Sequence, residues 1–137
     1  IPFLSKMFAV RDIMTRNVMT FEVNVPLQIV ISNMVQRNFG CACLLEQGKL
    51  VGIITERDII RKLVYPNKRL DEMTVAQIMT SGNLITTNAD QTILDAAKLM
   101  KLQRIKYLPV VTDDGHFVGL VTQTDIVHNI EHLLVIF

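Results

Sequence analysis

A short motif that could hold a sugar occurs twice in the sequence. The pattern Gly-x-x-Thr-x-x-Asp spans residues 52–58 and recurs at residues 119–125, each time where an apolar run passes into a polar one. Thr and Asp three residues apart at a helix start can project from one side of the first turn. An ionised Asp accepts hydrogen bonds from two neighbouring sugar hydroxyls, and a helix N-terminus suits an anion such as phosphate. The motif therefore indicates two matched binding sites.

The same spacing also fits a purely structural role. In a capping box, the Thr and the acidic residue three positions later satisfy the first N–H groups of their own helix. Thr92 and Asp95 fit that pattern, and Thr74 with Gln77 is close to it, although neither pair follows a strand that contains glycine. The preceding glycine, repeated at matched positions in both halves, favours binding, and capping stays open as the alternative.

The whole chain is an internal repeat, of which this motif is one part. Residues 10–15 (Val-Arg-Asp-Ile-Met-Thr) recur as residues 75–80 (Val-Ala-Gln-Ile-Met-Thr), and residues 48–59 recur as 115–126. The offset grows only from 65 to 67 residues along the chain. We predict one repeat over 9–65, a linker over 66–73 and a second repeat over 74–131.

Each half is predicted to contain a short strand, a helix, two strands and a second helix. Apolar residues recur at helical spacing after Pro26 and after Thr92. These positions are Leu27, Val30, Ile31, Met34 and Val35 in the first half, and Ile93, Ala96, Ala97 and Met100 in the second. Two apolar runs then flank a turn that contains Gly48 or Gly115, which predicts a hairpin, and a helix follows from about residue 56 or 123.

The fold class expected from this order is α+β. One repeat of about 55 residues is too small to hide its apolar face alone. We therefore expect two repeats packed sheet to sheet with a pseudo-twofold axis.

Composition narrows the function further. The chain has 137 residues, of which 50% are hydrophobic, and its 14 basic and 13 acidic residues argue against binding nucleic acid through a global basic field. No apolar run reaches the roughly 20 residues of a membrane helix, and residues 1–8 are too short for a signal peptide. Cys41 and Cys43 are poor disulfide partners, so we expect buried thiols in a reducing cytoplasm.

Taken together, the motifs resemble the CBS-domain family, in which two repeats form one module. The resemblance rests on the Met-Thr pairs at 14–15 and 79–80, on the Leu-Pro-Val at 108–110, and on the Val-Gly-h-h-Thr-x-x-Asp-Ile at 51–59 and 118–126. It covers about residues 9–130. It implies a regulatory module that binds AMP, ADP, ATP or S-adenosylmethionine in clefts between the repeats, with no catalytic residue, no metal and no bound cofactor.

The resemblance also implies which residues line those clefts. The ribose is expected at Thr55, Asp58, Thr122 and Asp125. The adenine is expected at Val18, Met19 and Thr20 and at Leu84, Ile85 and Thr86, with the next strand contributing Cys41, Ala42 and Cys43 and Tyr107, Leu108 and Pro109. Lys106 and Arg57 are candidates for phosphate. If Lys106 serves the cleft of Asp58, that cleft collects both cations and is the favoured phosphate site, and occupancy of the other cleft stays open.

Other features point to weaker alternatives. His128 and His132 share a helix face but lack the Glu of a zincin, and the basic stretches at 57–69 and 98–106 are expected to be solvated. The apolar tail 132–137 either packs on the module or forms part of a dimer contact. We expect a homodimer that regulates a partner protein not named by the sequence. A purely structural dimerisation module is the main rival, and no nucleophile lies in a recognisable catalytic sequence.

Overall fold

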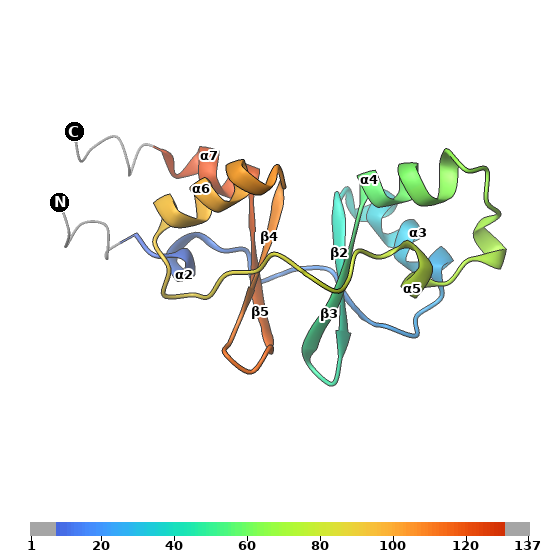
Figure 1. The fold of residues 1–137 in the computed structure, drawn as a ribbon, viewed down its shortest axis with the longest axis horizontal. Coiled ribbons are helices and arrows are strands. Elements are labelled where there is room, and N and C mark those ends of the chain that lie inside the picture. Colours follow the sequence, from blue (N-terminus) through green and yellow to red (C-terminus); the bar gives the residue numbers. More distant parts are fainter. Residues whose placement is uncertain (1–7, 131–137) are drawn as a thin grey trace. The chain divides into compact units, whose positions relative to one another are not determined.

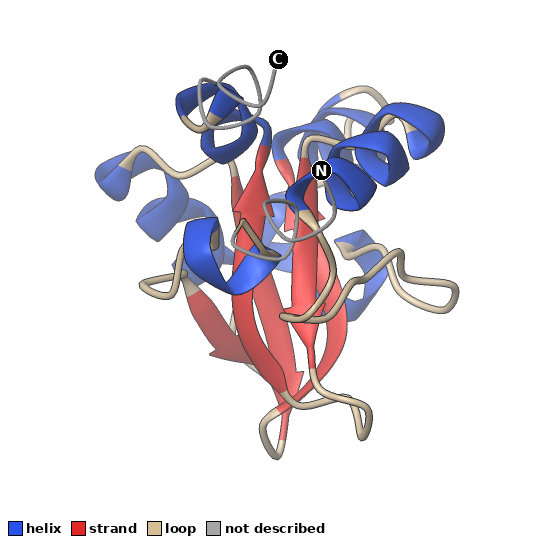
Figure 2. Ribbon diagram, turned by 90° about the vertical axis from the view of Figure 1, so that its left-hand side faces the viewer, coloured by secondary structure: helices blue, strands red, loops and turns tan. Residues whose placement is uncertain are grey.

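The computed structural model describes residues 8–130, and this part of the chain divides into two compact units. The continuous unit is residues 18–84, and the split unit joins residues 8–17 to residues 85–130. Both units combine helices with strands (Figure 1, Figure 2), which confirms the predicted α+β class.

The continuous unit is built on a three-stranded sheet in the order β1-β2-β3. The strands are β1 (Thr20–Glu22), β2 (Cys41–Glu46) and β3 (Lys49–Thr55). β1 runs parallel to β2, and β2 and β3 form the predicted hairpin. Its turn residues Gln47 and Gly48 both have positive φ, as a tight hairpin with a right-handed twist requires.

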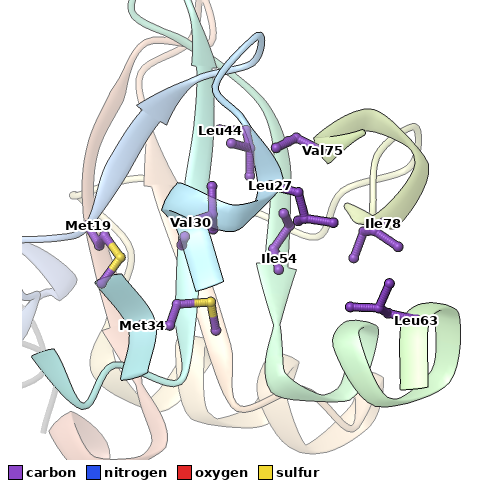
Figure 3. Packing of buried hydrophobic residues seen from close by; sticks show 10 residues of the cluster. Met19, Leu27, Val30, Met34, Leu44, Ile54, Leu63, Val75 and Ile78 are labelled. Atoms are coloured by element: carbon purple, nitrogen blue, oxygen red, sulfur yellow. The ribbon is translucent and has the colours of Figure 1, made fainter. Parts of the chain in front are cut away.

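Helical segments pack against this sheet and contribute apolar side chains to the core of the unit. They are α3 (Leu27–Arg37), α4 (Glu56–Ile59) with a π-helical continuation (Ile60–Val64), a 3₁₀ turn (Leu70–Glu72) and α5 (Val75–Ile78). Figure 3 shows Val30 of α3, Ile54 of β3 and Ile78 of α5 in one buried cluster. The predicted apolar face of α3 is buried at Leu27, Val30 and Met34, whereas Val35 is 75% exposed.

The split unit repeats this plan with one strand fewer. Its elements are α2 (Val10–Ile13), α6 (Ile93–Gln103), β4 (Tyr107–Val111), β5 (Phe117–Thr122) and α7 (Gln123–His128). Its buried cluster contains Val10, Ala96, Met100, Leu108, Val110 and Val121. Among residues 8–130, no helix combines the length and the apolar character needed to cross a bilayer.

The two long helices begin and end in matched ways. Thr92 caps α6 as expected, because its side chain accepts a hydrogen bond from the Asp95 N–H. Pro26 is the N-cap of α3, directly before the first apolar residue of the predicted helix. Asn38 and Arg104 end α3 and α6 in the left-handed conformation, at φ 55° and 57°. The terminal N–H groups of both residues reach back to carbonyls of the last turn.

The short strand predicted over residues 84–86 is reduced to a single bridge between Thr87 and Val110. In the continuous unit, the Cys43 N–H donates to the Met19 carbonyl at 2.9 Å and so extends the parallel pairing. Pro109 holds the position that Cys43 holds in the first hairpin, and proline has no N–H to donate. The missing donor explains why the third strand of the split unit does not form.

Each Met-Thr segment pairs with the hairpin of the other sequence repeat. Thr15 exchanges backbone hydrogen bonds of 2.7 and 2.9 Å with Leu120 of β5, and Thr80 exchanges bonds of 2.8 and 3.0 Å with Ile53 of β3. The two compact units therefore differ from the sequence repeats 9–65 and 74–131, because each unit takes its Met-Thr segment from the repeat that supplies the other hairpin.

Glycine is required in β3 and β5 at the points where these segments cross. A Cβ on Gly119 would lie 2.9 Å from the Met14 Sδ and 3.1 Å from the Thr15 carbonyl oxygen, and a Cβ on Gly52 would overlap the side chain of Met79. The glycine of the repeated motif thus makes room for the methionine of the Met-Thr pair.

We expect Gly119→Ala to destabilise the protein by about 1–3 kcal/mol, because the obstacle includes backbone that cannot rotate away. Gly52→Ala should cost less, since the side chain of Met79 is flexible. Urea unfolding followed by circular dichroism measures both. A Gly119→Ala protein as stable as the parent would show that the Thr15 carbonyl does not lie this close.

The two cysteines are free and buried in β2, as the sequence predicted. Burial raises the pKa of the Cys41 thiol to about 12 and also raises that of Cys43 well above its ordinary value.

Both thiols should therefore be protonated and unreactive at pH 8, because only the thiolate is nucleophilic. We expect no rapid reaction with a disulfide reagent in the native protein, and reaction of both thiols in urea. Rapid labelling of the folded protein at pH 8 would contradict the burial of β2.

Candidate functional site

The first Thr-x-x-Asp motif forms a complete capping box at the start of α4. The Thr55 side chain accepts from the Asp58 N–H at 3.2 Å, and Asp58 Oδ2 accepts from the Thr55 N–H at 2.9 Å and from its hydroxyl at 3.1 Å. The capping role that the sequence left open as an alternative is therefore present here. Capping alone does not decide the question of binding, because a carboxylate has about four acceptor positions.

The second oxygen of Asp58 has two further partners in the same unit. Thr80 donates its hydroxyl to Asp58 Oδ1 at 2.8 Å, and Lys62 Nζ lies 3.1 Å from the same oxygen. Lys62 also donates to the Ile78 and Met79 carbonyls at 3.1 and 3.3 Å. Asp58 is only 8% exposed, and its carboxylate connects α4 to Thr80, in the segment that follows α5.

The second motif has the same cap with fewer additional donors. Asp125 Oδ2 accepts from the Thr122 N–H at 2.9 Å, and the Thr122 side chain accepts from the Asp125 N–H at 3.0 Å. The Thr15 hydroxyl lies 3.2 and 3.1 Å from the two carboxylate oxygens. Asn129 stands where the first motif has Lys62, and its amide donates to the Asp125 backbone carbonyl at 2.7 Å.

Thr15 and Thr80 are candidate site residues that the sequence reasoning missed. Each gives its hydroxyl to the aspartate of one motif, at 2.8 Å for Thr80 and at 3.1–3.2 Å for Thr15. The recurrence of the Met-Thr pair in both halves was a sequence signal for these two threonines. Their contact with the aspartates could not be predicted from it, because Thr15 lies 110 residues from its aspartate and Thr80 lies 22 residues from its own.

The strand residues expected near an adenine differ in burial. Met19 and all of Cys41, Ala42 and Cys43 are buried, Val18 is half-buried and Thr20 is exposed. Leu84, Ile85, Thr86 and Tyr107 are half-buried, whereas Leu108 and Pro109 are buried. Tyr107 lies opposite Thr122 in the β4–β5 hairpin, so these two predicted site residues are adjacent.

The two basic candidates are exposed and lie beside the helix starts. Arg57 follows Thr55 in the first turn of α4. The Lys106 carbonyl accepts from the Gln123 N–H at 2.9 Å, which places the backbone of Lys106 at the start of α7. Lys106 is thus next to the Thr122–Asp125 motif within the split unit. That Lys106 binds a phosphate at the Asp58 motif stays a prediction.

An open hollow of about 610 Å³ lies elsewhere in the split unit. It is lined by Arg11, Arg16 and Asp90, among others, and Arg11 forms an ion pair with Asp90. Neither Thr122 nor Asp125 lines this hollow.

The histidines have ordinary surroundings. His116 Nδ1 lies 2.9 Å from Asp114 Oδ2 near the β4–β5 turn, and the Thr112 hydroxyl together with His116 lowers the pKa of Asp114. His128 is exposed at the end of α7, and both His132 and the tail 132–137 lie outside the described residues. Within residues 8–130, no three His, Cys, Asp or Glu side chains gather as metal ligands would.

Comparison with known proteins agrees with the duplicated architecture. The chain matches the family model of the CBS domain twice, over residues 10–65 and 75–132. It is 34% identical to the CBS domain-containing protein YhcV of Bacillus subtilis over 123 residues, which cover 90% of this chain and 86% of that protein. It is 36% identical to the mitochondrial CBS domain-containing protein CBSX3 of Arabidopsis thaliana over 74% of this chain, and that match spans about half (51%) of CBSX3.

A solved structure of similar fold is the CBS domain pair of protein MJ0100, crystallised in complex with 5′-methylthioadenosine and S-adenosyl-L-methionine. The TM-score is 0.78 at 32% sequence identity, and the match covers 89% of this chain and 98% of that one. With two family matches that together span most of its length, this chain belongs to the CBS domain family and carries a pair of CBS repeats.

Proposed function

We propose that this chain is a regulatory module that senses an adenosine-type ligand, such as AMP, ADP, ATP or S-adenosylmethionine. The family membership and the adenosyl ligands of the MJ0100 pair, which is 32% identical, support this class of ligand. A segment similar to this chain forms 22% of the inosine-5′-monophosphate dehydrogenase of Thermoplasma acidophilum, which fits a regulatory part within a longer protein. The proposal therefore assigns no reaction to this chain.

The observation that carries the proposal is the aspartate fixed by a cap at the start of α7, Asp125. A carboxylate fixed in this way by its own helix can accept hydrogen bonds from the two hydroxyls of a ribose without rearrangement. Capping and binding are compatible, since the cap at Asp125 uses one oxygen for the Thr122 N–H. The cap then serves to orient the group that binds the sugar.

The base and the phosphate would be met by the neighbouring segments. The adenine would lie against the half-buried residues Ile85, Thr86 and Tyr107 of the split unit, of which Tyr107 begins β4. The backbone of Lys106 lies at the start of α7. Its ammonium group would therefore attract a phosphate or carboxylate group of a ligand bound there. Arg57 is the corresponding cation at the first motif.

Signalling would follow from a difference in affinity. A ligand shifts a conformational equilibrium only if it binds one arrangement more tightly than the other. We propose that the favoured arrangement is recognised by a partner protein or a further domain, and that the module works in the cytoplasm, where its free cysteines stay reduced.

A dimerisation module is the second candidate, and exposed apolar side chains favour it. Val64 and Tyr65, at the end of the π-helical segment, are 63% and 86% exposed, and Leu102 of α6 is 77% exposed. Such side chains are common at contacts between copies of a chain. A homodimer is compatible with ligand sensing, so only a dimer without any ligand would replace the first proposal.

Thermal unfolding in the presence of AMP, ATP, S-adenosylmethionine and 5′-methylthioadenosine tests the proposal. A ligand at 100 times its Kd should stabilise the fold by about 2.7 kcal/mol. That gain corresponds to a rise in Tm of several degrees for a chain of this size. No shift with any of the four, together with a dimer mass by light scattering, would replace the sensor by the dimerisation module.

A further inference from the structure

The two aspartates differ in how many of their acceptor positions are already taken. Four donors lie within hydrogen-bond or ion-pair distance of the Asp58 carboxylate: the Thr55 N–H, the Thr55 hydroxyl, the Thr80 hydroxyl and Lys62 Nζ. Four is about the full capacity of an ionised carboxylate. Asp58 is also buried, so an additional donor would have to displace one of these partners.

The Asp125 carboxylate has about half as many hydrogen-bond donors as it can accept. Among the described residues, its donors are the Thr122 N–H and the single hydroxyl proton of Thr15, which lies between the two oxygens. About two acceptor positions remain, which is the number that the cis-diol of a ribose requires. Asp125 is half-buried and therefore more open than Asp58.

Lys62 is the residue that creates the largest part of this difference. Its ammonium group contacts Asp58 Oδ1 and the Ile78 and Met79 carbonyls at 3.1–3.3 Å, so it neutralises the carboxylate and holds it against the Met-Thr segment. At the matched position, Asn129 is neutral and directs its amide to a backbone carbonyl instead of the carboxylate. The negative charge of Asp125 is thus left without a cationic partner in its own motif.

We infer that the two motifs are not equivalent sites: the Asp125 motif accepts the ribose, and Lys62 closes the Asp58 motif, which serves as a structural tie. This inference rests on the proposed function, because it concerns the same adenosine-type ligand. It reverses the preference that the sequence alone suggested, since the Asp58 motif was favoured there for its two nearby cations.

Calorimetric titration with 5′-methylthioadenosine, which carries no phosphate, tests the inference on the full chain. We expect one ligand per chain, a loss of affinity of about tenfold or more in Asp125→Asn, and little change in the matched Asp58→Asn protein. Asn129→Lys, which copies Lys62 into the second motif, should also weaken binding at least about tenfold.

The control for that variant is Asn129→Ala, which removes the amide without adding a charge and should bind nearly as well as the parent. The Tm of each variant shows whether it is folded. Two ligands per chain, loss of binding in Asp58→Asn alone, or parent-like binding by Asn129→Lys would overturn the inference and leave the sensor proposal standing. If the parent binds neither 5′-methylthioadenosine, AMP nor S-adenosylmethionine, both proposals fail.

Discussion

A buried or half-buried carboxylate at the start of a helix needs hydrogen-bond donors. This chain has two such carboxylates and supplies them with different donors. Asp58 is satisfied by its own cap, a threonine hydroxyl and an ammonium group, whereas Asp125 receives only the cap and one hydroxyl from the part of the chain that the structure describes. A buried carboxylate that lacked partners would cost several kcal/mol. The remaining capacity of a half-buried carboxylate such as Asp125 is available to water or to a ligand, and this difference in donors is the basis for the proposed difference between the two motifs.

The hydroxyl that reaches each aspartate from outside its cap comes from a Met-Thr segment, so both motifs depend on how the chain brings these segments to the hairpins. Thr15 pairs with β5 and Thr80 with β3, and the glycines at 119 and 52 make room for the neighbouring methionines. In each unit, one segment therefore closes the edge of the hairpin and also supplies a hydroxyl to the aspartate. A change in that segment would reach the candidate ribose site directly, which suits a regulatory module.

Local sequence patterns predicted most of the fold, because they depend on neighbours along the chain. The amphipathic spacing from Leu27 gave α3, the glycine turns gave both hairpins, and Thr92 capped α6 as expected. Contacts between distant residues were not predictable in this way: Thr15 meets Asp125 across 110 positions, and no local rule relates them. The loss of the strand at 84–86 was in principle predictable, since Pro109 visibly lacks the donor that Cys43 has. The role of Lys62 could not be predicted, because it depends on the position of the ammonium group relative to Asp58 and the two carbonyls.

If Asp125 accepts the sugar while Asp58 keeps its internal partners, the two carboxyl groups should respond differently to a ligand. Carbon-13 NMR of the side-chain carboxyl groups during titration with 5′-methylthioadenosine measures both responses. We expect the Asp125 carboxyl resonance to move with ligand occupancy and the Asp58 resonance to stay in place. Movement of the Asp58 resonance with that of Asp125 unchanged would contradict this expectation.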